Sequence, residues 1–436
     1  MRSVLIIMDA FAPENSCATI PNTKLVKYLA RQDLKITLIT KAVTPDMNLD
    51  ESLVPKEISS MRVLRVDYGK VFSSTVQASR NKMTENGVKQ KMKKESRPFR
   101  ALLVSAIKET YFGLRSRDWL NSARKLIRKE LQNEHFDCIY STFPDVAAHT
   151  LAEELMKKGM ADRWIADFRD PMYYEYHDSF ANQHKHRLQM KIEKKADHVT
   201  IVSEGALDKF LCDDVAEDKI TYIPNGYDPE DMDNIEAKPT AGVLRIFYAG
   251  SLYWGKRDLT VVFRALRELA DEGVIDLNKI LIEYAGKEWD VMESFAEKYD
   301  LLSICKNYGF ITRKKVVEIL SEVDCTAVCS HNTAADKGVV TGKVFELLMV
   351  GKPIITVVNG DVPDSELGRI VRQCDAGIVY EQATDERDYA ALKLWLLEKY
   401  KQKQECGHVS CSVKTEERDK YSYANIARQL YELMVR

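Results

Sequence analysis

The stretch that decides the fold is residues 4–40, VLIIMDAFAPENSCATIPNTKLVKYLARQDLKITLIT. It opens with a short apolar run, residues 4–8, and closes with a second largely apolar run at residues 36–40. Between the two runs, residues 21–32 carry apolar side chains at helical spacing. A buried strand, a helix and another buried strand in this order predict a parallel sheet with helices on its faces.

Two series of such elements follow one another along the chain. The first half continues with runs of strand length at residues 61–66, 138–141, 164–167 and 199–202. The second series has runs at residues 244–249, 280–285, 325–329 and 354–358, with helical patterns at 259–272 and 343–349. We therefore predict an α/β protein with two Rossmann-like, doubly wound domains.

The stretch between the two series, residues 224–240, is rich in turn-forming residues, and we place the hinge there. In doubly wound sheets, ligands bind beyond the carboxyl ends of the strands. Two such domains facing each other would therefore form a central cleft, and the loops that follow the strands are the places to look for functional residues.

The composition is that of a globular protein. The chain has 436 residues, of which 45% are hydrophobic and 30% charged, enough for two domains. A net charge of −2 gives no reason to bind nucleic acid. No apolar run reaches the ~20 residues of a membrane-spanning helix, and residues 4–8 indicate a first strand rather than a signal peptide. The nine cysteines form no CxxC pair, so we expect free thiols and a cytoplasmic location.

One segment differs from the rest of the chain in its charge. Residues 80–130 contain 15 Lys or Arg against 5 Asp or Glu, a net +10 on a chain whose total is −2. Phe99, Leu103 and Ile107 recur within it at helical spacing. We predict a basic helical insertion that can dock on an anionic membrane surface. The alternative is that the apolar stripe packs on the first domain while the lysines face water.

The strongest local signal for chemistry is residues 341–355, TGKVFELLMVGKPII. Thr341 and Gly342 begin a helix, where free N–H groups favour an anion such as a diphosphate. Lys343 adds a cation, and Glu346, one turn further on the same face, can accept hydrogen bonds from ribose hydroxyls. The alternative is an ordinary capped helix with a Lys–Glu pair at i,i+3.

Two further loops carry charges directly after a predicted strand. Residues 250–257, GSLYWGKR, deliver Lys256 and Arg257, which can balance the charge of a leaving diphosphate. The alternative is a solvated basic turn. Residues 167–171, DFRDP, follow a strand of the first domain and suggest an acceptor or catalytic site. The alternative there is a structural ion pair between Arg169 and Asp170.

Other well-known motifs are absent from the sequence. No GxGxxG follows a strand and no GxxxxGK[ST] occurs, which disfavours a dinucleotide-binding oxidoreductase and a P-loop enzyme. Asp231 and Asp233 lie in a polar linker, and His177, His184 and His186 suit a polar surface helix better than a metal. The sequence therefore predicts no metal site.

The ordered series of motifs resembles the GT-B-fold glycosyltransferases of family 4, the large retaining group that builds bacterial capsule, O-antigen and exopolysaccharide. The resemblance covers nearly the whole chain. The matching segments are residues 11–14 (FAPE), 27–30 (KYLA), 196–204 (ADHVTIVSE), 223–228 (IPNGYD), 248–251 (YAGS) and 351–353 (GKP).

The chain departs from the family pattern at four places. Asn15 and Ser16 begin the stretch that often reads Gly-Gly, and Ser251 stands where many members have arginine. Of the usual two glutamates eight positions apart, Glu346 matches the second, but Gly338 occupies the first position. After the strand that ends at residue 167, many members have a histidine; this chain has Arg169-Asp170 instead, like a subgroup that reads "RD-P".

The resemblance implies an acceptor-binding domain at residues 1–230, a nucleotide-sugar-binding domain at 240–415 and a final helix at 416–436 that returns to the first domain. It implies retaining transfer of a hexose from a UDP- or GDP-type donor to a lipid-linked or growing glycan, without metal or cofactor. The implied donor-binding residues are Gly250, Ser251, Lys256, Arg257, Thr341, Gly342, Lys343 and Glu346. The implied catalytic residues are Arg169, Asp170, Lys256 and Arg257. The implied acceptor-side or cleft residues are Asp167, Ser203, Asn225, Asn15 and Ser16.

Two functions of other classes remain open at this point. A GT-B-fold epimerase would act on the nucleotide sugar itself with no acceptor. A catalytically silent partner protein of glycan assembly is also conceivable, because the first glutamate of the family pair is absent.

Overall fold

The computed structural model describes residues 1–44, 47–69, 98–143, 146–173, 180–210, 216–232 and 242–436, without the side chains of 98–112, 180, 181, 217 and 232. The chain forms two compact units. The first comprises Met1–Val202, Lys209–Ile223 and Ile426–Arg436, and the second Ser203–Asp208 and Pro224–Asn425. Sequence analysis placed Ser203–Asp208 in the first domain, whereas its contacts put it in the second unit.

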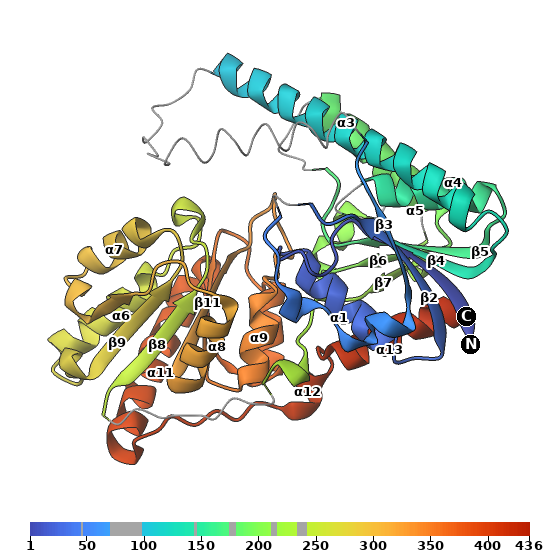
Figure 1. Ribbon diagram of the computed structural model, residues 1–436. Coiled ribbons are helices and arrows are strands. Elements are labelled where there is room, and N and C mark those ends of the chain that lie inside the picture. Colours follow the sequence, from blue (N-terminus) through green and yellow to red (C-terminus); the bar gives the residue numbers. More distant parts are fainter. Residues whose placement is uncertain (45–46, 70–97, 144–145, 174–179, 211–215, 233–241) are drawn as a thin grey trace. The chain divides into compact units, whose positions relative to one another are not determined.

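The first unit is a seven-stranded parallel sheet in the order β3-β2-β1-β4-β5-β6-β7. Its strands are β1 (Arg2–Ile7), β2 (Leu34–Lys41), β3 (Arg62–Val66), β4 (Phe136–Phe143), β5 (Ala161–Phe168), β6 (His198–Ile201) and β7 (Ile220–Tyr222). One face carries α3 (Pro98–Glu130), α4 (Val146–Lys157) and α5 (Phe180–Lys195), and the other α1 (Thr19–Leu29) and α13 (Tyr423–Val435) (Figure 1). Most of the final helix, Ile426–Val435, belongs to the first unit.

The second unit is a six-stranded parallel sheet in the order β10-β9-β8-β11-β12-β13. Its strands are β8 (Leu244–Ala249), β9 (Ile280–Ala285), β10 (Cys305–Asn307), β11 (Cys325–His331), β12 (Ile354–Asn359) and β13 (Gly377–Glu381). Its helices are α6 (Thr260–Asp271), α7 (Trp289–Glu297), α8 (Arg313–Glu322), α9 (Lys343–Val350), α10 (Glu366–Gln373), α11 (Asp385–Cys406) and α12 (Thr415–Asp419).

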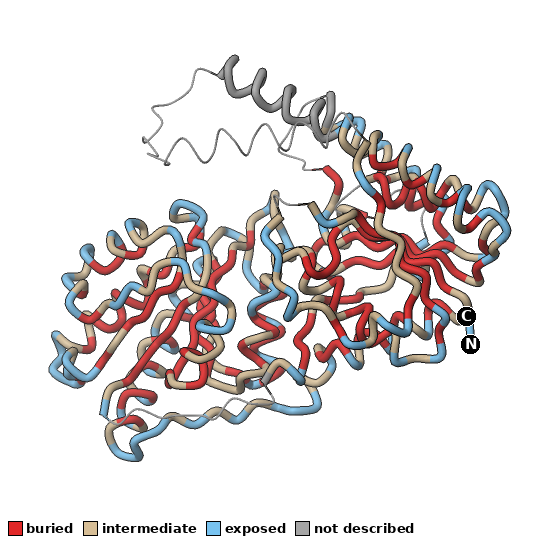
Figure 2. Tube along the Cα trace, in the orientation of Figure 1, coloured by how far each residue is buried: buried red, intermediate tan, exposed pale blue. Residues whose placement is uncertain are grey.

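Alternation along the strands builds two cores on the two faces of the second sheet. Tyr248 of β8 packs into the cluster formed with α6, α7 and α11, while the next residue back, Phe247, packs into the cluster formed with α8, α9 and α10. Both faces are therefore buried, as Figure 2 shows by the continuous buried colour along the strands. This explains why the strands are largely apolar in the sequence rather than alternating between apolar and polar residues; the charged Arg245 of β8 and Glu283 of β9 pair with each other.

The predicted strands of the second series agree with the structure, and β8 and β9 have the predicted bounds. The sequence analysis missed β7, β10 and β13. The strands β7 and β10 have three residues each and lie at sheet edges, so they carry too few apolar residues for a periodic signal. The strand β13 begins at Gly377 and ends at Glu381, which leaves only three adjacent apolar residues between them.

The basic segment is only partly described. Lys89, Lys91, Lys93, Lys94 and Arg97 lie outside the described residues. Phe99, Leu103 and Ile107 lie on α3, a helix of 33 residues that continues to Glu130. Within the described residues, no helix has both the length and the apolar character that crossing a membrane requires.

A cluster of charges holds α4 against α5 in the first unit. The Glu153 side chain is 9% exposed, and its carboxylate pairs with Lys157 at 2.8 Å, with Lys191 at 2.9 Å and with Lys195. Burial raises the pKa of Glu153, but the hydrogen bonds from the three lysines outweigh burial and lower it to about 2. Glu153 is therefore ionised in the folded protein at any ordinary pH.

We expect Glu153→Gln to lower the free energy of unfolding at pH 7 by about 2 kcal/mol, because the charged acceptor of three cations is lost. The folded pKa is depressed, so this stability is present above the unfolded value of about 4.5 and is lost as pH falls toward 2. In urea unfolding at pH 7, 5 and 3, the difference in the free energy of unfolding between the wild type and Glu153→Gln should shrink as the pH falls. Glu318→Gln, which removes one exposed pair with Lys315, should change little; an equal effect of both substitutions would contradict the prediction.

Candidate functional site

The order of the second sheet fixes where a ligand can bind. From β8 the following strands, β9 and β10, are added on one side of the sheet, and from β11 the strands β12 and β13 are added on the other side. The neighbouring strands β8 and β11 are therefore followed by connections that lead in opposite directions. Ligands of doubly wound sheets bind at the carboxyl ends of two such strands. Here the loop that starts at Gly250 follows β8, and His331 ends β11.

Arg257 is the most informative cation at this position. It is 9% exposed, yet no carboxylate of the described residues lies within ion-pair distance of it. Its Nε is buried without a hydrogen-bond partner, and its guanidinium stacks on the Tyr253 ring at 4.4 Å from the centroid. A buried charge without a counter-charge is costly, so such groups mark places where an anion binds.

A second cation lies over Gly250, the glycine that follows β8. Gly250 has φ of +155°, and a Cβ built on it would lie 2.1 Å from Lys343 Nζ. The ammonium therefore occupies the space that any side chain at position 250 would need. Lys343 is the first residue of α9, after Thr341 and Gly342, so the helix N-terminus is brought to the same place. Lys256 is exposed on the loop beside Arg257.

His331 adds a titratable group that the sequence analysis did not single out. Its Nε2 lies 3.6 Å from an Asp336 oxygen, and its Nδ1 is buried without a partner. Burial lowers the pKa of His331, Asp336 raises it, and the charges of Arg257 and Lys256 lower it further. The net direction is downward, so the imidazole is neutral near pH 7 and can donate or accept a hydrogen bond. Its position at a strand end was the signal available in the sequence.

The loop after β8 is fixed by a residue from the next loop of the sheet, Glu288. Its carboxylate accepts hydrogen bonds from the backbone N–H groups of Leu252 (2.7 Å), Tyr253 (3.2 Å) and Trp254 (2.8 Å), and from the Ser251 hydroxyl. The sequence analysis missed Glu288, because nothing local links it to a loop about 36 residues earlier.

Glu346 has a partner in the structure. One carboxylate oxygen lies 3.0 Å from Arg313 Nη2, and the same nitrogen lies 2.9 Å from an Asp231 oxygen. The Glu346 side chain remains 33% exposed, which leaves room for a further hydrogen bond. Its proposed contact with a ribose therefore stays a prediction.

The position of the family's missing glutamate cannot hold one here. Gly338 has φ of +70°, and a Cβ there would lie 2.3 Å from Ser203 Oγ and 2.6 Å from the Ala206 backbone nitrogen. Ser203 is 3% exposed, and its hydroxyl lies 2.6 Å from both the Gly338 carbonyl oxygen and a Glu366 oxygen. The Ser203 side chain is therefore occupied within the second unit.

In the first unit, Asp167 is fully buried. Its oxygens accept hydrogen bonds from Thr142 and Thr200 at 2.7 Å, and Arg169 Nε lies 3.1 Å away. Asp167 has no exposed side-chain atom with which to contact a ligand, and its partner Arg169 also donates to the Ile223 carbonyl at 2.9 Å. The ion pair that forms is Asp167–Arg169, not the Arg169–Asp170 pair considered as an alternative.

Asp170 is exposed to solvent, yet the surrounding protein raises the pKa of its carboxyl, while the Arg169 charge opposes that shift. The other predicted acceptor-side residues have their own contacts. The Ser16 hydroxyl accepts from Thr19 N–H at 3.3 Å at the start of α1, and Asn15 N–H donates to the Asn48 carbonyl at 2.8 Å. Asn225, in the second unit, has a buried Oδ1 without a hydrogen-bond partner.

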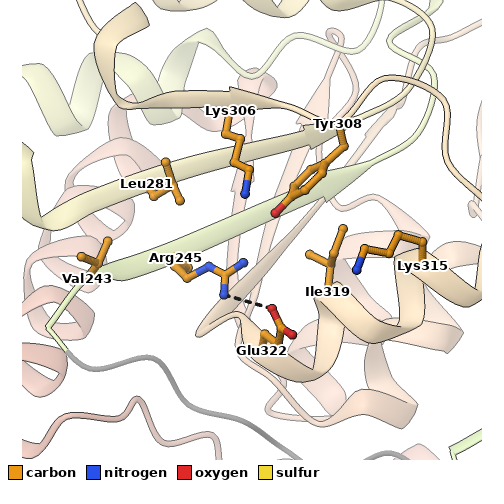
Figure 3. A pocket seen from close by; sticks show the side chains of 8 residues that line it. All are labelled: Val243, Arg245, Leu281, Lys306, Tyr308, Lys315, Ile319 and Glu322. Carbon is orange, nitrogen blue, oxygen red and sulfur yellow. Dashed lines mark hydrogen bonds and ion pairs between the residues drawn. The ribbon is translucent and has the colours of Figure 1, made fainter.

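A cavity of about 460 Å³ lies elsewhere in the second unit (Figure 3). It is lined by Val243, Arg245, Leu281, Lys306, Tyr308, Lys315, Ile319 and Glu322. Arg245 and Leu281 are the second residues of β8 and β9, so this cavity lies toward the amino ends of the strands, away from Gly250. Among the described residues, no group of three His, Cys, Asp or Glu is placed to hold a metal ion.

Comparisons with known proteins bear on part of the chain and on the fold. Residues 89–231 match the family described as Glycosyltransferase Family 4. A search of curated proteins gave no significant match.

The fold is similar to that of several solved structures. Sucrose-phosphate synthase from Thermosynechococcus elongatus has 12% identity and a TM-score of 0.60, covering 99% of this chain and 98% of that one. HepE from Anabaena in complex with UDP has 10% identity and a TM-score of 0.60, with 99% of both chains covered. The lipopolysaccharide outer core galactosyltransferase WaaB has 10% identity and a TM-score of 0.55, again over 99% of both chains. At such identities these likenesses show the fold, and the predicted GT-B architecture is confirmed.

Proposed function

We propose that this chain, which has the GT-B fold and matches the Glycosyltransferase Family 4 model over residues 89–231, transfers a sugar from a nucleotide diphosphate sugar. The donor is of the UDP or GDP type, and the acceptor is a lipid-linked or growing glycan of surface polysaccharide synthesis. Support for the donor class comes from the structurally similar HepE, which binds UDP and UDP-glucose.

The observation that carries this proposal is Arg257, a buried cation without a counter-charge at the carboxyl end of β8. A diphosphate supplies the missing negative charge. As the bond from the sugar to the diphosphate breaks, charge grows on the leaving group, and preorganised cations stabilise the transition state more than the ground state. Lys256, Lys343 and the first turn of α9 act in the same direction.

We assign the acceptor side to Arg169 and Asp170 in the first unit. Asp167 holds Arg169 from inside the sheet, and the exposed Asp170 carboxylate beside it is available to accept a proton from an incoming hydroxyl. The anomeric configuration is retained. Because side-chain cations supply the positive charge, no metal is needed, and turnover should persist in excess EDTA.

Two measurements test the function. A thermal-shift screen with UDP, GDP, ADP and CDP should identify one nucleotide that stabilises the protein, since a ligand at 100 times its Kd contributes ~2.7 kcal/mol. Nucleotide release from the matching donor sugar should then require a lipid-linked acceptor. Sugar epimerisation without an acceptor would instead support an epimerase. Nucleotide binding without any turnover would support a silent partner protein.

We further propose that the enzyme works at the inner face of the membrane, where a lipid-linked acceptor is exposed. Each Lys or Arg near an anionic surface contributes about 1 kcal/mol before screening. On anionic vesicles the wild type should float, and flotation should fall with rising salt. A variant with six cations of the basic segment changed to glutamine should stay in solution, and equal flotation of both proteins would exclude this docking. The six are Lys89, Lys91, Lys93, Lys94, Arg97 and Arg100.

A further inference from the structure

The loop after β8 adopts a conformation that its own residues disfavour. Tyr253 and Trp254 both have positive φ, +51° and +54°, which side chains other than glycine rarely adopt. The Trp254 side chain is also 87% exposed, so burial does not stabilise this arrangement. Consecutive residues in such a conformation persist only where the surroundings hold them, and they concentrate at functional sites.

Glu288 is the residue that holds them. Both of its oxygens are used: Oε2 accepts from the Ser251 hydroxyl and from the N–H groups of Leu252 and Tyr253, and Oε1 accepts from Trp254 N–H. A carboxylate that accepts several hydrogen bonds has its negative charge distributed over their donors. Burial raises the pKa of Glu288, but these hydrogen bonds outweigh it and lower the pKa, so the group is ionised near neutral pH.

A tyrosine ties Glu288 to the end of β8 by a separate route. The buried Tyr284 hydroxyl accepts from the Glu288 backbone N–H at 3.1 Å and donates to the Gly250 carbonyl at 3.1 Å. Gly286 between them leaves room for this hydroxyl, since a Cβ there would lie 2.1 Å from it. Two independent sets of hydrogen bonds therefore join the loop after β9 to the loop after β8.

The same loop conformation places Arg257. The backbone N–H of Arg257 donates to the Leu252 carbonyl at 3.0 Å, and the backbone N–H of Lys256 donates to the Tyr253 carbonyl at 3.2 Å. The Arg257 guanidinium lies on the Tyr253 ring. Each of these contacts depends on a residue whose backbone N–H is bound by Glu288.

We propose that Glu288 is the positioning residue of the donor site: it fixes the backbone of residues 251–254 and thereby holds Arg257 where the leaving diphosphate binds. This rests on the proposed function of the same site. It also gives a role to Ser251, which stands where many members of the family have arginine: its hydroxyl donates to Glu288 instead of presenting a cation.

The test uses the full-length chain and three variants. Glu288→Ala removes the carboxylate, and Glu288→Gln keeps one oxygen as an acceptor but turns an N–H₂ group toward a backbone N–H. The control, Glu297→Gln, makes the same chemical change at an exposed position of α7. Hydrogen exchange reports on residues 251–257, and calorimetry gives the Kd of the nucleotide diphosphate selected by the four-base screen and of inorganic pyrophosphate.

For Glu288→Ala we expect about 10-fold faster exchange of the Leu252, Tyr253 and Trp254 amides and a roughly 10-fold higher Kd, with a smaller change for Glu288→Gln. The control should match the wild type in both. Tyr284→Phe, which removes only the hydroxyl, should also speed amide exchange and raise the Kd. This variant replaces Glu288→Ala if the Glu288→Ala protein does not fold.

The outcomes separate this inference from the proposed function. Faster exchange with unchanged Kd would make Glu288 a structural residue only, and unchanged exchange would show that it does not hold the loop; either result overturns the inference. A wild type that binds pyrophosphate but no nucleotide would refute the proposed function. The role of Glu288 would then be judged from the Kd of pyrophosphate for the wild type and the variants. A wild type that binds neither ligand would refute both.

Discussion

The Arg257→Met variant should lose about 10²–10³-fold of its sugar-transfer rate and yet unfold at no lower temperature than the wild type. The rate falls because, in the proposed site, the buried guanidinium stabilises the charge that develops on the leaving diphosphate. Nucleotide diphosphate binding should weaken by a smaller factor, about 10-fold, because the charge to be balanced is smaller before the bond breaks.

Stability should not fall, because Arg257 makes no ion pair with the described residues and is 9% exposed. Removing a buried charge that lacks a counter-charge removes its desolvation cost, and methionine fills a similar volume. A residue of structural importance would show the opposite result, with lower stability and proportionate loss of activity.

Steady-state kinetics with calorimetric unfolding of the same samples checks this prediction. Arg267→Met is the matched control, because Arg267 lies on the surface of α6 and pairs with Asp271; it should retain its kcat. If Arg257→Met raises KM with kcat intact, Arg257 is a binding group and does not contribute to leaving-group stabilisation.

The Lys403→Met variant should be destabilised by about 3–5 kcal/mol, which lowers the melting temperature of a unit of this size by about 10 °C. Lys403 lies on α11, is fully buried, and its Nζ donates to Asp324 Oδ1 at 2.7 Å. The other oxygen of Asp324 accepts from the Arg245 backbone N–H at 3.0 Å at the start of β8. Methionine would leave the Asp324 carboxylate buried at 5% exposure without its cation.

Differential scanning calorimetry tests the effect, with Lys401→Met as control, because Lys401 is exposed on the same helix. Adding Asp324→Asn to Lys403→Met should recover part of the lost stability, since the uncompensated charge disappears while one oxygen still accepts from Arg245. A loss no larger than that of the control would show that the pair contributes nothing beyond packing.

The sequence by itself determined the elements and the chemistry that each strand end carries. The runs that became β8 and β9 are apolar apart from Arg245 and Glu283, because both faces of each strand are covered, and this is visible in six adjacent letters. Gly250, Lys256 and Lys343 were also identified from the sequence, because a glycine or a cation after a strand, or at the start of a helix, is a local pattern. Short edge strands such as β10 contain too few residues to give a recognisable local pattern.

The tertiary structure alone decided which of these residues act together. Pairing of β8 with β9 brings Glu288 to a loop about 36 residues earlier, and pairing of β8 with β11 places His331 near Arg257. It also decided that Arg257 is buried without a counter-charge, that Asp167 is sealed inside its sheet, and that Gly338 has no room for a glutamate. The physical reason is that burial and strand order depend on contacts between residues far apart in the chain, and no local periodicity encodes them.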